Sequence, residues 1–280
     1  MSPRVAFLGT PATAVPALRA LATQVPVAAV FCNADKPTGR GRKLEPPPVK
    51  VAAQELGLEV FQPLRWRADE TRTLWEGLGI DLAVVVAYGH LLPTWMLDSC
   101  RLGAWNLHFS LLPRWRGAAP VNHAILAGDA ETGVALMGIT PGLDEGPVLA
   151  TLRRPIRETD TAEGLLATLA EASGGLLVEH LPALMAGTAC PVPQAPTGAT
   201  YAAKLDKAMA RLDLQRSAQE LHRQVRGLAP WPGTELQVAG TPLKVCEVGG
   251  IRPCSDPPGT LVWDREGARL AAGDGRALEL

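Results

Sequence analysis

Residues 82–86 read Leu-Ala-Val-Val-Val, and they decide the fold class of this 280-residue chain. A continuous apolar run of this length, rich in β-branched residues, is typical of a strand buried on both faces of a parallel sheet. Apolar runs at residues 5–8 and 25–32 flank a helix-compatible stretch at residues 12–23, which is the pattern of a strand–helix–strand unit. The alternation of helical and strand-like segments continues beyond them. The sequence therefore predicts an α/β domain with a mostly parallel sheet covered by helices on both faces.

A second, smaller domain is predicted at the C-terminal end. Residues 187–198 are rich in Pro, Gly, Thr and Ala, a composition typical of a linker. Beyond a helix-like stretch at residues 217–227, short strand-like pieces are separated by Gly and Pro, which suits a small barrel. We therefore predict a large first domain at residues 1–188, a linker at 189–204 and a C-terminal domain at 205–280.

Composition argues against several classes of protein. Hydrophobic residues make up 47% of the chain, enough to fill the cores of a globular protein. The five cysteines are odd in number and include no Cys-x-x-Cys pair, which argues against a disulfide framework and a zinc ribbon. Neither an export signal nor an apolar run of membrane-spanning length is evident. We therefore expect a cytoplasmic protein that does not enter a membrane.

The net charge of −1 hides two basic segments. Residues 33–50 carry five basic and two acidic side chains, and residues 201–231 carry six and three, so each segment has a local charge of +3. Residues 33–48 of the first segment are also rich in Pro and Gly, and we expect a long loop without regular structure there. Loops of this length are usually functional or disordered. The positive charge of the two segments suits a polyanionic partner, although charged loops are more often merely solvated.

The candidate site begins at Asn106, where the residues to Pro113 read Asn-Leu-His-Phe-Ser-Leu-Leu-Pro. Because side chains alternate along an extended segment, Asn106, His108 and Ser110 are expected to share one face. In open α/β sheets, ligands bind beyond the carboxyl ends of the strands. An amide and an imidazole there could hold a developing oxyanion. A strand with one solvated face shows the same alternation, so both interpretations stay open at this point.

The same stretch, continued as Pro113-Arg-Trp-Arg-Gly-Ala-Ala-Pro120, closely resembles the folate-dependent formyltransferases. The segment Gly142-Leu-Asp-Glu-Gly146 is similar to another motif of that family. So are Thr200-Tyr-Ala-Ala-Lys-Leu205 and Pro230-Trp-Pro-Gly233, and the resemblance therefore spans both predicted domains. It implies a Rossmann-like N-terminal formyltransferase domain and a C-terminal β-barrel of the oligonucleotide-binding (OB) type.

The resemblance implies that a formyl group moves from N10 of 10-formyltetrahydrofolate to the α-amine of methionyl initiator tRNA. Asn106 and His108 would donate hydrogen bonds to the tetrahedral oxyanion, and Asp144 would accept the proton lost by the amine. A nearby carboxylate also favours the protonated imidazole. No metal or permanently bound cofactor is implied, and we expect a monomer. Two alternatives stay open: a formyltransferase acting on an amino sugar nucleotide with the same three residues, and a non-catalytic RNA-binding relative.

The resemblance also implies binding residues, although the stretches concerned could be ordinary loops and Asp144 an ordinary turn residue. The residues expected to hold the folate lie after two predicted strands; they are Tyr88, Leu91, Leu92, Ser110, Leu111, Leu112 and Pro113. The residues expected to bind tRNA follow the first strand or lie in the two basic segments; they are Thr10, Arg40, Arg42, Lys43, Lys204 and Lys207.

Overall fold

The structure is a computed structural model, and it describes residues 2–38, 43–238, 240–265 and 267–280. The chain divides into two compact units. Unit 1 consists of Met1–Gly117, Gly133–Arg153 and Ala167–Tyr201. Unit 2 consists of Ala118–Thr132, Arg154–Leu166 and Ala202–Leu280. The domain limits expected around residues 189–204 stay a prediction.

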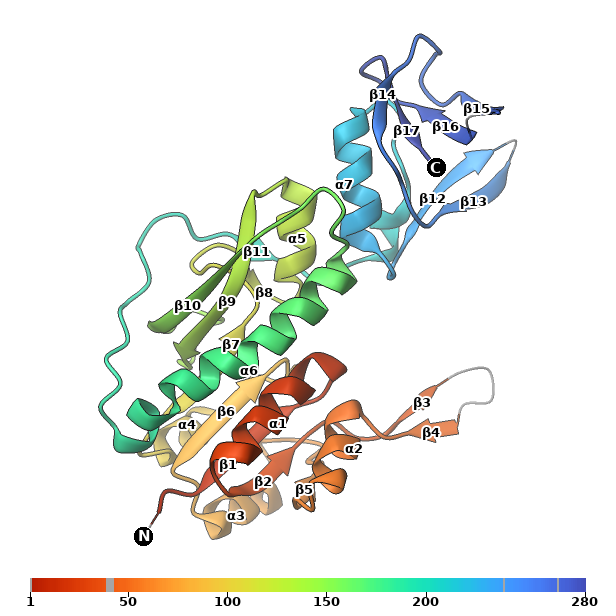
Figure 1. The fold of residues 1–280 in the computed structure, drawn as a ribbon. Coiled ribbons are helices and arrows are strands. Elements are labelled where there is room, and N and C mark those ends of the chain that lie inside the picture. Colours follow the sequence, from red (N-terminus) through yellow and green to blue (C-terminus); the bar gives the residue numbers. More distant parts are fainter. Residues whose placement is uncertain (1, 39–42, 239, 266) are drawn as a thin grey trace. The chain divides into compact units, whose positions relative to one another are not determined.

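A seven-stranded sheet forms the centre of unit 1, in the order β10-β9-β7-β6-β1-β2-β5 (Figure 1). The strand bounds are β1 Val5–Gly9, β2 Val27–Phe31, β5 Val60–Phe61, β6 Leu82–Val86, β7 Ala104–His108, β9 Glu131–Gly138 and β10 Val148–Pro155. The five strands from β7 to β5 pair in parallel, whereas β9 is antiparallel to β7. The predicted Rossmann-like, mostly parallel sheet is confirmed.

Helices cover both faces of this sheet, which explains why a strand such as β6 is apolar throughout. The helix bounds are η1 Ala12–Ala14, α1 Val15–Gln24, α2 Pro48–Glu55, α3 Asp69–Leu78, α4 Thr94–Ser99 and α6 Ala162–Ala186. On one face, Trp75 of α3 and Met96 of α4 pack with Phe31 in a buried cluster. Figure 1 shows α1 and α6 in front of β1 and β6. Gly174 of α6 lies so close to α1 that a Cβ there would be 3.0 Å from Ala20 Cβ.

The first basic segment contains regular structure, so the expectation of an irregular loop is wrong. Strands β3 (Lys36–Thr38) and β4 (Lys43–Glu45) form an antiparallel pair. The register places Lys36 opposite Glu45, and opposite charges across a ladder are favourable. A two-stranded ladder needs only backbone hydrogen bonds, so it forms without the apolar alternation by which strands are usually identified.

Unit 2 combines helical segments with antiparallel sheets (Figure 1). The bounds are α5 Pro120–Ala127, η2 Lys207–Ala210, α7 Ala218–Leu228, β12 Thr234–Val238, β13 Thr241–Val245, β14 Ile251–Pro253, β15 Leu261–Asp264, β16 Gly267–Ala271 and β17 Arg276–Glu279. A capping box of Ser217 and Glu220 begins α7. The sheets are β12-β13 and β14-β17-β16-β15, packed on α7 through Leu221, Leu236 and Leu270. The strand-rich, antiparallel C-terminal part is confirmed, whereas closure into an OB-like barrel stays a prediction.

Candidate active site

Asn106 and His108 lie at the carboxyl end of β7, inside the central sheet. In the register, Asn106 is opposite Val85 of β6 and Met137 of β9. The Asn106 side chain is half-buried and the His108 side chain is buried. Because they are two residues apart on one strand, both side chains project from the same face. The structure therefore brings the two predicted donors together.

The expected alternation does not extend to Ser110, because β7 ends at His108. The Ser110 N–H donates to the His108 carbonyl oxygen at 3.0 Å, which is a turn and no longer a strand. Ser110 is fully buried, and its Oγ donates to the Arg114 carbonyl oxygen at 2.7 Å. Its hydroxyl thus closes the turn after β7.

The two ring nitrogens of His108 face different oxygens. Nε2 lies 2.8 Å from the Trp115 carbonyl oxygen. Because a carbonyl oxygen only accepts hydrogen bonds, this contact requires the hydrogen on Nε2. Nδ1 lies 3.6 Å from Asp144 Oδ2, beyond hydrogen-bond distance but within the range of an ion pair. The Trp115 carbonyl therefore fixes the ring with its Nδ1 edge directed at Asp144.

The Asp144 carboxylate is held by a backbone group. Its Oδ2 accepts a hydrogen bond of 2.8 Å from the Gly117 N–H, and 16% of the side chain is exposed. Asp144 has φ +51°, a left-handed conformation that is uncommon outside glycine. Among the described residues, Trp115 and Ala87 are the other non-glycine residues with positive φ. Such strained residues cluster at functional sites, which favours a function at this edge of the sheet.

A segment of the predicted linker holds the backbone around Trp115. Strand β8 (Arg116–Gly117) pairs with β11 (Tyr201–Ala202). The Trp115 N–H donates to Thr200 Oγ1 at 2.9 Å, and the Arg116 N–H donates to the Thr200 carbonyl oxygen at 2.9 Å. Thr200 therefore fixes the residue whose carbonyl oxygen orients His108.

Gln194 from the same segment holds the backbone of Asp144, the residue that faces His108. Its Nε2 donates to the carbonyl oxygens of Asp144 at 2.7 Å and of Gly146 at 2.8 Å. Its Oε1 accepts from Nε and Nη2 of Arg116 at 3.1 and 2.8 Å. No sequence motif pointed to Gln194, which lies in a stretch without periodicity or a recognised chemical pattern. Thr200 begins the motif at residues 200–205, but the sequence predicted no role for its side chain.

The other predicted folate-binding residues lie at the carboxyl ends of β6 and β7. Leu111, Leu112 and Pro113 are half-buried, whereas Leu91 is 77% exposed and Leu92 half-buried. Leu111, Leu112 and Pro113 lie in the turn that Ser110 closes, whereas Leu92 packs against the buried cluster around Phe31.

Tyr88, also predicted to hold the folate, points into the core. Its hydroxyl accepts a hydrogen bond of 2.9 Å from Trp66 Nε1, and the two rings meet edge to face. Burial raises the pKa of Tyr88 to about 12. Only the backbone of Tyr88 is therefore available to a ligand.

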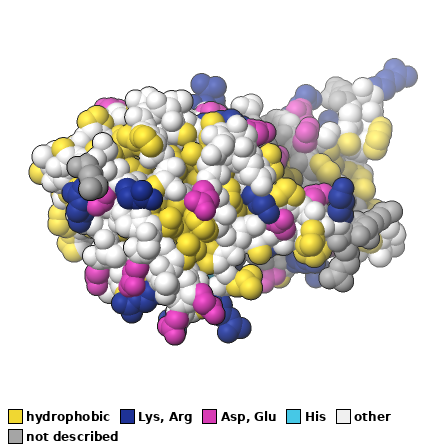
Figure 2. Space-filling model, turned by 90° about the horizontal axis from the view of Figure 1, so that it is seen from below, with side chains coloured by type: hydrophobic (Ala, Val, Ile, Leu, Met, Phe, Trp, Pro, Cys, Tyr) yellow, Lys and Arg dark blue, Asp and Glu magenta, His cyan; other side chains and the backbone are white. Residues whose placement is uncertain are grey.

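The residues predicted to bind tRNA are described in part. Thr10 is half-buried at the end of β1, where its Oγ1 donates to the Tyr88 carbonyl oxygen at 3.4 Å and accepts from the Asn33 N–H at 3.2 Å. Lys43, Lys204 and Lys207 are exposed. Arg40 and Arg42 lie outside the described residues. On the face in Figure 2, basic and acidic side chains are interspersed.

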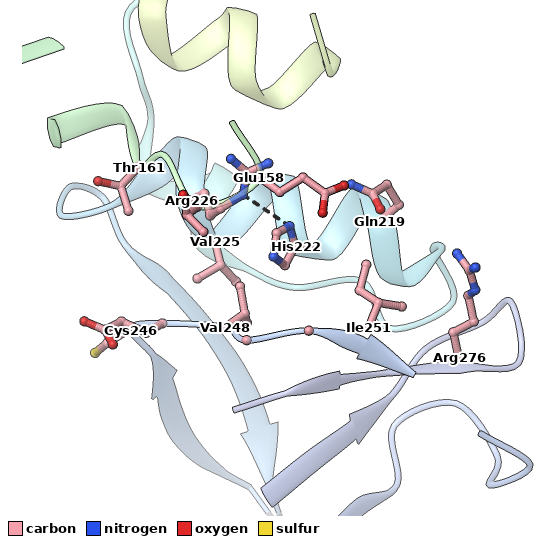
Figure 3. A pocket seen from close by; sticks show the side chains of 14 residues that line it. Glu158, Thr161, Gln219, His222, Val225, Arg226, Cys246, Val248, Ile251 and Arg276 are labelled. Atoms are coloured by element: carbon pink, nitrogen blue, oxygen red, sulfur yellow. Dashed lines mark hydrogen bonds between the residues drawn. The ribbon is translucent and has the colours of Figure 1, made fainter. Parts of the chain in front are cut away.

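A pocket of about 670 Å³ lies in unit 2, between α7 and the segments at residues 158–161 and 246–251 (Figure 3). Arg226 Nε donates to His222 Nδ1 at 3.2 Å, and Nη1 donates to the Asp160 carbonyl oxygen at 2.7 Å. Burial and the adjacent Arg226 charge lower the pKa of His222. The predicted site residues do not line this pocket.

Membrane insertion and metal binding are two other classes of function. In that part of the chain, no helix combines the length and apolarity needed to cross a membrane. Nor do three or more His, Cys, Asp or Glu side chains gather there in a group that could hold a metal ion.

Comparisons with known proteins agree over nearly the whole chain. The model of the formyl transferase family matches residues 3–181, and the model of the formyl transferase C-terminal domain matches residues 204–280. A methionyl-tRNA formyltransferase of Halorhodospira halophila is 48% identical over 276 residues, covering 98% of this chain and 86% of the relative. One of Methylococcus capsulatus is 46% identical over 281 residues, covering 99% and 91%.

Among solved structures, an N-formyltransferase from Helicobacter canadensis in complex with folinic acid and dTDP-3-aminofucose has a similar fold. Its TM-score is 0.74 at 17% sequence identity, covering 99% of this chain and 98% of that one. A likeness at that identity supports the fold alone. The two family models and the two relatives of high identity show that the chain belongs to the formyl transferase family.

Proposed function

We propose that this protein transfers the formyl group of 10-formyltetrahydrofolate to the amino group of methionyl initiator tRNA, giving N-formylmethionyl-tRNA. The observation that carries the proposal is the joint placement of Asn106 and His108 at the end of β7, with Asp144 Oδ2 3.6 Å from His108 Nδ1. The substrate assignment rests on the 46–48% identity to methionyl-tRNA formyltransferases over almost the whole chain.

The chemistry begins with a neutral amine. An α-amino group has a pKa of about 8, so a useful fraction is neutral at cellular pH. Its nitrogen attacks the formyl carbon, and the carbonyl electron pair moves to oxygen. The difficult species is the tetrahedral oxyanion. The Asn106 amide donates a hydrogen bond to that oxygen from a position fixed by the sheet.

His108 supplies the second donor. Because its Nε2–H is used by the Trp115 carbonyl, only the Nδ1 edge is available, and only the protonated ring carries a hydrogen there. In that state Nδ1–H donates to the oxyanion beside Asp144.

Asp144 moves the proton. As the bond between the formyl carbon and N10 breaks, N10 needs a proton, and the attacking amine must lose one. The reaction therefore moves one proton from the amine to N10. The Asp144 carboxylate, directly or through water, is the group placed to accept it, while the Gly117 N–H keeps Oδ2 in position.

Binding of the two substrates uses different surfaces. The apolar side chains of Leu91, Leu92 and residues 111–113, with the backbone of Tyr88, form the proposed folate site. For tRNA, basic side chains give affinity that is independent of sequence and weakens with salt. Those proposed to contact it, together with Thr10, are Arg40, Arg42, Lys43, Lys204 and Lys207. We propose a cytoplasmic monomer.

The test is a choice between acceptors. Purified protein is given radiolabelled 10-formyltetrahydrofolate with methionyl initiator tRNA and, separately, with dTDP-3-aminofucose. We expect label on the tRNA, bound as an amide to methionine, and none on the sugar nucleotide. Transfer to the sugar nucleotide, or binding of tRNA without any transfer, would reject the proposal.

A further inference from the structure

We propose that Gln194 is a positioning residue for Asp144, so that the segment predicted as a linker takes part in formyl transfer. The carrying observation is that one amide side chain contacts both the backbone of Asp144 and the arginine next to Gly117, whose N–H holds the Asp144 carboxylate. This inference deepens the proposed function and rests on the proton-transfer role of Asp144.

The Gln194 amide uses all its hydrogen-bonding capacity at this place. A glutamine amide has two N–H donors and an oxygen with two lone pairs. Both donors go to carbonyl oxygens of the loop at residues 142–146, at 2.7 Å for Asp144 and 2.8 Å for Gly146. The oxygen accepts two hydrogen bonds from the buried Arg116 guanidinium. Gln194 is therefore oriented in one way only.

The loop at residues 142–146 depends on such support because of its own backbone. Asp144 has φ +51°, and a non-glycine residue keeps such a conformation only when its surroundings impose it. The loop also lies directly against β9, since a Cβ at Gly146 would lie 1.8 Å from the Gly138 carbonyl oxygen. Gln194 and β9 thus both hold the loop.

The same amide reaches the carboxylate of Asp144 through Arg116. Gly117, which follows Arg116 on β8, donates its N–H to Asp144 Oδ2 at 2.8 Å. Gln194 holds the Arg116 side chain, and Thr200 of the same segment holds the Arg116 backbone N–H. The segment at residues 194–200 therefore supports both the main chain of Asp144 and the backbone N–H that holds its carboxylate.

Loss of Gln194 should change turnover and leave binding unchanged. The amide lies on the backbone side of Asp144, and no predicted folate- or tRNA-binding residue is among its hydrogen-bond partners in the described part of the chain. A misplacement of about 1 Å in a catalytic group costs on the order of a hundredfold in rate. For Gln194→Ala we expect kcat to fall about ten- to a hundredfold, with KM for methionyl-tRNA and for the formyl donor unchanged.

Two further variants separate the parts of the contact. Gln194→Glu keeps an acceptor for Arg116 but removes the two N–H donors, so we expect a loss of kcat similar to that of Gln194→Ala. Because it leaves the buried guanidinium paired, it also carries the test if Gln194→Ala fails to fold. Thr197→Ala, an exposed position in the same segment, is the control and should match the wild type. Wild-type kcat in Gln194→Glu would overturn the proposal.

A double-mutant cycle with Asp144→Asn tests whether Gln194 acts through Asp144. We expect Gln194→Ala to add no further loss of kcat in the Asp144→Asn background. If the two losses of kcat multiply in the double variant, Gln194 acts elsewhere than through Asp144. That result would overturn this inference and leave the proposed function in place. Wild-type turnover of Asp144→Asn by itself would overturn the proton-transfer role of Asp144 and, with it, this inference.

Discussion

Gly146→Ala is a one-carbon change expected to disable the site without touching a catalytic side chain. The new Cβ would lie 1.8 Å from the Gly138 carbonyl oxygen, whereas real Cβ atoms essentially never approach closer than 3.0 Å. The two atoms must therefore separate by at least a further 1.2 Å. Gly138 is the last residue of β9, which pairs with the strand carrying Asn106 and His108. The loop with Asp144 is accordingly the part that moves.

The expected effect follows from that displacement. A shift of about 1 Å in a catalytic group costs on the order of a hundredfold in rate. Overpacking of this kind also lowers the free energy of unfolding by about 1–3 kcal/mol. We expect kcat for formylation of methionyl-tRNA to fall about a hundredfold, with a cooperative thermal unfolding transition retained.

Gly142→Ala, in the same loop, is the matched control. There the new Cβ would meet Glu145 Oε2 at 2.4 Å, the far end of a flexible and half-exposed side chain that can move aside. We expect near-normal kcat for Gly142→Ala, measured in the same steady-state assay. Equal kcat of Gly146→Ala and wild type, or an equal loss of kcat in both variants, would show that the contact of Gly146 with β9 does not position Asp144.

Three other predictions concern groups outside the reaction. Burial raises the pKa of the Cys32 thiol to about 11. At about pH 8, iodoacetamide should therefore label the exposed Cys190 long before Cys32, as measured by mass spectrometry. Rapid labelling of Cys32 would contradict its burial. Burial and Arg226 lower the pKa of His222, so the unfolded state binds a proton more readily. Stability should therefore fall as pH drops below about 6.5, and His222→Gln should flatten that dependence in denaturant titrations; an unchanged slope would count against it. Lys43→Ala should raise the KM for methionyl-tRNA and make that KM less dependent on salt, while the KM for the formyl donor stays constant. An unchanged KM for methionyl-tRNA would exclude a contact between Lys43 and the tRNA.

The buried strands could be predicted because burial on both faces leaves a strong pattern in the sequence. The apolar run of residues 82–86 coincides with β6. That Asn106 and His108 share one face of β7 followed from the alternation of side chains along a strand. The same alternation failed at Ser110, because a sequence pattern does not state where a strand ends. The antiparallel pair of β3 and β4 was missed for a related reason, since the residues of β4 are exposed and leave no pattern of burial to detect.

The support of the site could not be predicted because its contacts link distant parts of the chain. Gln194 contacts Asp144 across 50 residues, and Thr200 contacts Trp115 across 85. Gln194 lies among prolines, glycines and small residues, a composition that is also typical of an ordinary linker. Thr200 belongs to a recognised motif, but the motif does not state what its side chain contacts. The resemblance to a family named the groups that we propose to react, whereas only the structure shows what holds them.

The proposed roles of Asp144 and Asn106 are tested by the single-turnover rate of formyl transfer to methionyl-tRNA in Asp144→Asn and Asn106→Ala. Both variants should bind the formyl donor as the wild type does and unfold at a similar temperature. We expect each to transfer the formyl group on the order of a hundred- to a thousandfold more slowly. A rate near that of the wild type in either variant would contradict the proposed role of that residue.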